Sequence, residues 1–102
     1  MDSVLIERWF AMTLVQQMVN IGNEVKRAVR FDTSSDKKSM FLDRAIRYTE
    51  LTMKDRKNQR VLPELTISKK VLEDYRGEHV LNCTKEQISN YYDVYVNCRR
   101  IN

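Results

Sequence analysis

The first third of the chain places apolar residues at the spacing of one helix face. Small or apolar residues recur there at alternating intervals of four and three: Ala11, Val15, Met18, Gly22, Val25 and Val29. At about 100° per residue these positions share one side of a helix, and Asn20, Asn23 and Arg27 fall on the other. The pattern predicts one long helix from Ser3 to Arg30, with the Met18 side as the spine on which later segments pack.

Three later stretches show the same periodicity. The segments Lys37–Lys54 and Val61–Tyr75 each carry an apolar side. Pro63 is tolerated only in the first turn of a helix, which fits its place in the second segment. Further on, Thr84 and Gln87 have the spacing of a capping box and predict the start of a last helix.

These elements predict an all-α fold, an antiparallel four-helix bundle with up-down-up-down topology and a long first helix. The links between the helices are short, and 102 residues are the size of one domain, here residues 1–102. Two glycines and one proline leave little material for strands and tight turns.

The two glycines have different expected roles. Gly22 lies in the middle of the first helix on its core side, where glycine costs about 1 kcal/mol relative to alanine. A close approach of a neighbouring helix is the expected reason; a kink or a gap for a ligand are the alternatives. Gly77 follows the third helical stretch and is a typical helix terminator.

Trp9 does not fit the core side of the first helix. It falls opposite Met18, together with Leu5, Met12 and Val19. An apolar patch that stays exposed usually marks a partner surface. The four residues therefore predict an interface with a second copy or a protein partner; burial beneath a loop or the C-terminal segment is the alternative.

Charge and cysteine content bear on the partners and the cellular compartment that we expect. The net charge of +4 arises from 18 basic and 14 acidic residues that are interleaved, so contact with nucleic acid is permitted but not required. No stretch approaches the roughly 20 apolar residues of a membrane span, and the first ten residues do not form a signal peptide. We expect a cytoplasmic protein with free thiols at Cys83 and Cys98.

Few residues suggest catalysis or metal binding. Two cysteines and one histidine do not form a recognisable zinc set, so we expect no metal and no cofactor. His79 stands beside Glu78 without a nucleophile nearby in sequence, and a loop histidine is the preferred interpretation. No catalytic residues are predicted. Arg27 and Arg30, beside Asn23, are a further candidate for a ligand or partner patch.

A basic connection is the candidate for nucleic-acid or anion contact. It contains Lys54, Arg56, Lys57 and Arg60, whose charges can hold phosphates. A solvated turn explains the same residues. Tyrosines on the last helix can stack on bases, but their helical spacing favours the core. They share an inner stripe with Ile88 and Cys98: Tyr91, Tyr92 and Tyr95.

Short motifs are spread over most of the chain. They are Glu7–Phe10 (ERWF), Asn20–Val25 (NIGNEV), Arg44–Ala45, Thr52, Asp55, Lys57–Asn58, Leu72–Tyr75 and Arg99. In these motifs the chain resembles a group of small bacterial all-helical proteins of unassigned role. The resemblance implies a helical bundle and carries no established activity.

The helix order also resembles that of HEPN bundles, many of which are RNases or toxin partners of nucleotidyltransferases. Active HEPN proteins carry an arginine and a histidine that are more widely spaced, whereas only two residues separate Arg76 from His79 here. The resemblance therefore implies a member without the RNase motif. We expect a non-catalytic interaction module that self-associates or docks a partner through the Trp9 patch. The alternative is a HEPN-like RNA-associated or toxin–antitoxin-type module.

Overall fold

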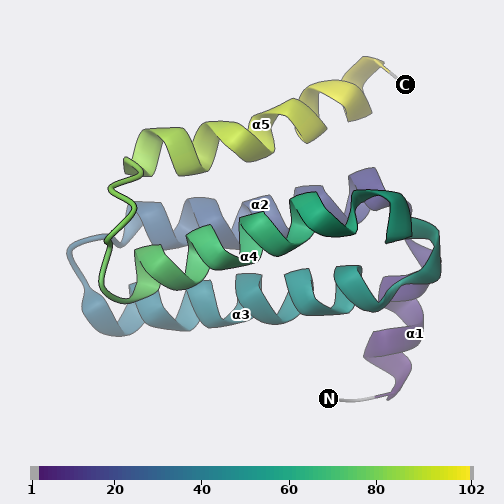
Figure 1. Cartoon of the computed structure of the whole chain (residues 1–102), viewed down its shortest axis with the longest axis horizontal. Coiled ribbons are helices and arrows are strands. Elements are labelled where there is room, and N and C mark those ends of the chain that lie inside the picture. Colours follow the sequence, from purple (N-terminus) through teal and green to yellow (C-terminus); the bar gives the residue numbers. More distant parts are fainter. Residues whose placement is uncertain (1–2, 102) are drawn as a thin grey trace.

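The computed structural model describes the backbone of residues 3–101 and the side chains of residues 3–95. The prediction of an all-α fold is confirmed, because the described backbone contains helices and no strand. Four long helices run antiparallel to their neighbours in sequence (Figure 1). They are α2 (Leu14–Arg30), α3 (Ser35–Lys54), α4 (Leu62–Arg76) and α5 (Lys85–Ile101).

The predicted single helix from Ser3 to Arg30 is wrong, because the chain breaks after a short helix α1 (Ser3–Ala11). Thr13 is the N-cap of α2: its Oγ1 accepts from Gln16 N at 3.1 Å, and its own N–H donates to Gln16 Oε1 at 2.9 Å. This capping box satisfies N–H groups that a new helix leaves without partners. The described helices therefore number five rather than four.

The long helices form an open arrangement rather than a closed bundle. Helix α2 packs on both α3 and α5, and α4 packs on α3. Helices α4 and α5 share no interface of comparable extent, and they lie apart along most of their length (Figure 1). A closed four-helix bundle would require that fourth contact.

From Met18 onward the core follows the predicted spine, whereas Ala11 is exposed and Val15 is only half-buried. Met18, Ile21 and Val25 on α2 are fully buried, as expected for the Met18 side. A Cβ at Gly22 would lie 2.7 Å from the Cβ of Tyr92 on α5. The predicted close approach of a neighbouring helix is confirmed, and α5 is that helix.

The connections end the helices largely as predicted. Pro63 lies in the first turn of α4, and Gly77 is the C-cap of that helix. The Asp74 carboxylate accepts backbone N–H groups of the following link, from Val80 at 2.7 Å and Leu81 at 3.1 Å. The predicted capping box at the start of α5 is also confirmed by two hydrogen bonds between Thr84 and Gln87, of 2.8 and 3.0 Å.

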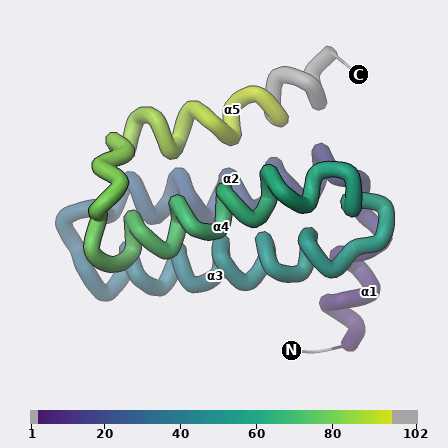
Figure 2. The backbone as a smooth tube through the Cα atoms, viewed as in Figure 1, coloured from purple at the N-terminus to yellow at the C-terminus, as the bar shows by residue number. Residues whose placement is uncertain are grey.

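A 3-10 helix, η1 (Arg56–Val61), joins α3 to α4. It lies at the same end of the molecule as α1, as the backbone path shows (Figure 2). The first turn of α2 and the last turn of α3 therefore lie at this end, together with α1 and η1. Of the described helices, none combines the length and the apolar character that a membrane span requires.

Candidate functional site

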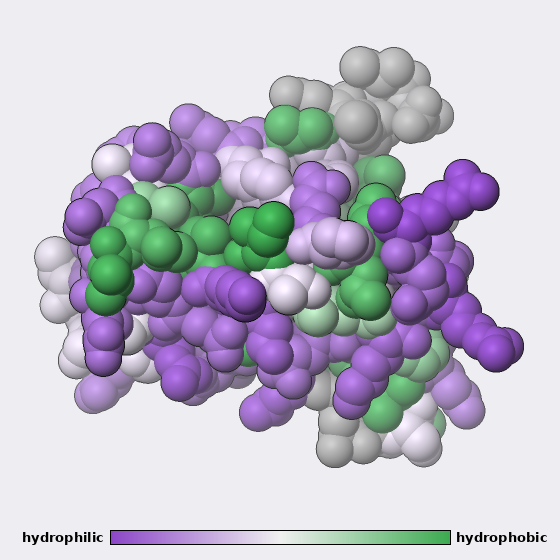
Figure 3. All heavy atoms as spheres, viewed as in Figure 1, coloured by the Kyte–Doolittle hydropathy of each residue, from purple (hydrophilic) through white to green (hydrophobic). Residues whose placement is uncertain are grey.

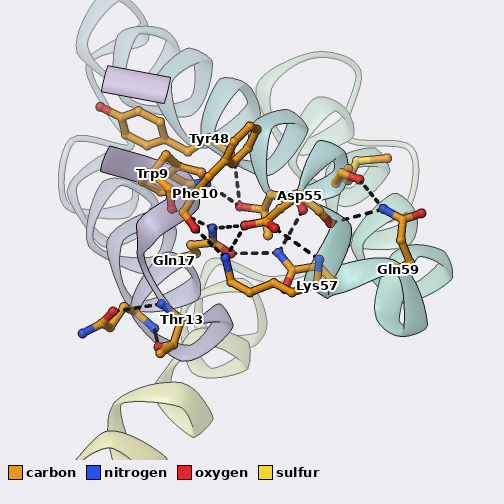
Figure 4. A network of polar contacts seen from close by, with 12 residues as sticks. Trp9, Phe10, Thr13, Gln17, Tyr48, Asp55, Lys57 and Gln59 are labelled. Carbon is orange, nitrogen blue, oxygen red and sulfur yellow. Dashed lines mark hydrogen bonds and ion pairs between the residues drawn. The ribbon is translucent and has the colours of Figure 1, made fainter. Parts of the chain in front are cut away.

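A buried polar network lies where α1, α2 and η1 meet (Figure 4). Trp9 Nε1 donates to Thr52 Oγ1 at 3.0 Å. Gln17 Nε2 donates to the Trp9 carbonyl at 2.8 Å and to Asp55 Oδ2 at 2.9 Å. Asn58 Nδ2 donates to Gln17 Oε1 at 2.8 Å. Because all five residues are at least nine-tenths buried, the network acts as an internal anchor of α1 rather than as an exposed binding surface.

Lys57 belongs to this anchor. Its Nζ donates to the Phe10 carbonyl at 2.8 Å and forms an ion pair with Asp55. The other basic residues predicted to contact nucleic acid are exposed: Lys54, Arg56 and Arg60. The structure therefore divides the predicted basic set: all four residues are exposed, but the ammonium group of Lys57 is bonded to Asp55 and to the Phe10 carbonyl.

Trp9 is buried, with 3% of its surface exposed, and its ring stacks on Tyr48 with centroids 4.7 Å apart. Of the other residues predicted with it, Val19 is buried, Met12 is half-buried and Leu5 is 39% exposed. The described residues thus form no exposed patch centred on Trp9. The break before α2 is the reason, because it turns α1 so that Trp9 faces α3.

Asp55 is kept ionised by its partners. Burial raises the pKa of its carboxyl, but hydrogen bonds from Lys57 and Gln17 outweigh burial and hold the pKa below the ordinary value of 3.8. The carboxylate therefore stabilises the fold fully above 3.8. That contribution is lost as the pH falls through the lowered pKa of the folded state.

Asp55→Asn is expected to lower the free energy of unfolding by about 2 kcal/mol at neutral pH, because two charge-assisted hydrogen bonds are weakened. The difference from the natural chain should shrink as the pH falls below 3.8 and through the lowered pKa of the folded state, where the Asp55 carboxyl becomes protonated. Urea unfolding, followed by circular dichroism at neutral pH and at a pH below 3.8, measures this difference in the free energy of unfolding. A difference that stays the same in acid would show that the Asp55 charge is unimportant.

A hollow of about 300 Å³ opens between α1, α2 and α3. Leu5, Trp9 and Met12 line it, so three of the four residues predicted as a partner surface border this hollow. Polar residues of α2 line the other side: Asn20, Asn23, Glu24 and Arg27. The sequence predicted Arg27 as part of a ligand patch but did not single out Glu24. The signal for Glu24 was an acidic residue within the apolar periodicity of α2.

Glu24 is the most unusual residue in the hollow. It is 8% exposed, and its Oε1 accepts from Arg27 Nη1 at 2.6 Å. Its Oε2 is buried without a hydrogen-bond donor, and Arg44 Nη1 lies 4.0 Å from it. A buried carboxylate oxygen normally has a donor, so this atom has unused capacity to accept one.

An apolar groove of about 170 Å³ lies between α4 and α5. Apolar side chains gather along it on the face seen in Figure 3. Ile67, Val71, Ile88 and Tyr91 are among the residues that line it. Ile67 is 63% exposed, and Val94 on the same side of α5 is 58% exposed. Sequence reasoning missed Ile67, although it is an apolar residue outside the core side of its helix.

A tyrosine hydroxyl group and a cysteine thiol also belong to the groove. The Tyr91 hydroxyl lies 3.1 Å from Ser68 Oγ and joins α5 to α4. Cys83 lines the groove as a half-buried free thiol, and the Cys98 side chain lies outside the described residues. Tyr92 is 2% exposed, which confirms the core interpretation for that tyrosine. Tyr91 and Tyr95 pack against the core only in part.

His79 lies in the link after α4, as predicted. Its Nε2–H donates to the Cys83 carbonyl at 2.7 Å, and its backbone φ is 55°. Arg76 forms an ion pair with Asp43 on α3 instead of facing His79. Within the part of the chain that the structure describes, no three His, Cys, Asp or Glu residues group closely enough to hold a metal ion.

Comparisons with known proteins add no family to this geometry. No family model, no curated protein and no solved structure matches the chain at a significant level.

Proposed function

We propose that this chain is a helical interaction module that self-associates, with a second copy covering the α4–α5 groove. The observation that carries the proposal is the open apolar groove itself, with Ile67 exposed among the residues that line it. Of eight large apolar residues exposed in the described part of the chain, four lie on α4, α5 or their link: Ile67, Val80, Leu81 and Val94. An exposed apolar groove marks an association surface more often than single scattered apolar residues do.

The charges beside the groove favour a second copy as the partner. Glu64 and Lys70 are exposed and stand three residues before and three after Ile67 on α4. A two-fold axis passing near Ile67 would bring Glu64 of each copy opposite Lys70 of the other. In a two-fold interface the same patch must complement itself, and this charge pattern meets that condition. A partner surface with charges of one sign only would bring a like charge against either Glu64 or Lys70.

The RNA-associated alternative has weaker support at the basic connection. Lys57, one of its four predicted contacts, is bonded to Asp55 and to the Phe10 carbonyl. Because the ammonium group of that lysine is already engaged, fewer charges are free to bind phosphates. We therefore place the interface on the groove, and not on the connection or on buried Trp9.

Ile67→Lys is expected to abolish self-association, because a lysine would be desolvated at the centre of the apolar interface. Size-exclusion chromatography with light scattering measures the molar mass in solution. That mass should be twice the 12.2 kDa chain mass for the natural chain and equal to the chain mass for the variant. Met40→Lys is the matched control, since Met40 is an apolar residue of α3 that is 43% exposed and lies away from the groove. A natural chain that is monomeric at every concentration would contradict the proposal.

Charge reversal tests the two-fold arrangement. Lys70→Glu alone should weaken self-association, because each Glu64 would then face a like charge. Adding Glu64→Lys should restore it, because the pair is exchanged and not removed. Each exposed pair contributes only about 0.2–1 kcal/mol, so the comparison belongs at low salt. Equal affinities for the single and double variants would place the axis elsewhere.

A further inference from the structure

The hollow between α1, α2 and α3 is separate from the α4–α5 groove and has a different character. Its volume of about 300 Å³ is at the lower end of small-molecule sites. One wall is apolar, with Leu5, Met12 and Tyr48, and the other carries charged and amide groups of α2. A ligand that fits both walls needs a flat or apolar body and polar groups at defined places.

The charges of the hollow select an anion. Arg8 and Arg27 line it, and Arg44 lies beside it, close to Glu24. The side chains of Arg27 and Arg44 are each 51% exposed, so they can turn to a ligand. Among the residues that line the hollow, Arg27 is paired with Glu24, and Arg8 supplies the excess positive charge. Guanidinium groups bind phosphate through paired hydrogen bonds, which makes phosphate the favoured anion.

Glu24 adds a second requirement. Its Oε2 has no hydrogen-bond donor and almost no exposed surface, so a ligand N–H group would satisfy it once the Glu24 side chain turns toward the hollow. A simple phosphate or carboxylate ion offers no N–H and would be repelled by the carboxylate. A simple amine offers N–H groups but would meet the like charges of Arg8 and Arg27. The ligand must therefore carry a donor and an anionic group on one molecule.

We propose that this hollow binds a nucleotide, with the base between the apolar wall and Glu24 and the phosphate on the arginines. The ring amino and imino groups of bases supply the N–H donor, and the planar base fits against Tyr48. Two sources share this chemistry: a free nucleoside monophosphate and a nucleotide unit of single-stranded RNA. The proposal is independent of self-association through the groove.

Titrations of the full chain followed by amide chemical shifts test the site. The probes are the four ribonucleoside monophosphates, the matching nucleosides, inorganic phosphate and a short single-stranded RNA. At least one monophosphate should bind more tightly than its nucleoside and more tightly than phosphate, with shifts centred on the hollow. Tighter binding of RNA would identify RNA as the source, and equal or weaker binding would identify the free nucleotide.

Arg8→Gln is the informative variant, because Arg8 is exposed on α1 and lies outside the core. We expect nucleotide binding to weaken by about tenfold, the effect of losing a charge-assisted hydrogen bond. Arg60→Gln is the control, since it removes the same charge from the basic connection. Absence of binding, phosphate binding as tightly as any nucleotide, or equal losses in both variants would each overturn the proposal.

Discussion

Gly22→Leu is expected to destabilise the fold by about 3 kcal/mol and to loosen α5 from α2. The Cβ of the new side chain would lie 2.7 Å from Tyr92 Cβ, at the root of that tyrosine. A side chain cannot rotate its own Cβ away, so the two helices must separate. The better helix propensity of leucine recovers only about 1 kcal/mol.

Urea unfolding measures the loss of stability, and amide hydrogen exchange locates it. Protection should fall in α5 more than in α3, because α3 does not contact Gly22 in this way. Asn23→Leu is the matched control: the same side chain is added one residue further, on an exposed position, and should change stability by less than about 0.5 kcal/mol. Similar losses for the two variants would contradict the close packing of α2 and α5.

Trp9→Ala is expected to cost about 4 kcal/mol, the loss typical of a buried large aromatic residue. The indole is 3% exposed, stacks on Tyr48 and donates to Thr52 Oγ1. Its removal takes away the main apolar contact of α1 with α3. Denaturant unfolding should show the loss, together with reduced helix content from α1.

Two companion variants separate the contributions at Trp9. Trp9→Phe keeps a ring but removes the N–H donor, and should cost roughly 1 kcal/mol more than a conservative core exchange. Phe10→Ala changes a neighbouring aromatic residue that is 38% exposed, and should have a small effect. If Phe10→Ala were as damaging as Trp9→Ala, α1 would be oriented differently from the structure described here.

The break between α1 and α2 shows what helical periodicity hides. Apolar spacing continues from Ala11 through Val15, so the wheel offers no sign of an interruption. The local signal was present, because Thr13 and Gln16 have the same Thr-x-x-Gln spacing that correctly predicted the start of α5 at Thr84. A capping box inside a periodic run therefore indicates a new helix as strongly as one that follows a loop.

The site was less predictable than the core. Met18 and Gly22 follow from periodicity, because burial on one helix face is a local property of the sequence. The buried positions of Gln17 and Asn58 do not, because polar residues are buried only when distant partners satisfy them. The burial of Trp9 depends on a distant residue in the same way, because its partner, Thr52, lies on another helix 43 residues further along the chain.

An isotope-filtered nuclear Overhauser experiment tests self-association through the α4–α5 groove. A mixture of labelled and unlabelled chains reports only contacts between copies. We expect contacts from the Ile67 methyl groups of one copy to α4 or α5 of another. Intermolecular contacts confined to other surfaces, or none at concentrations where the natural chain is fully soluble, would contradict it.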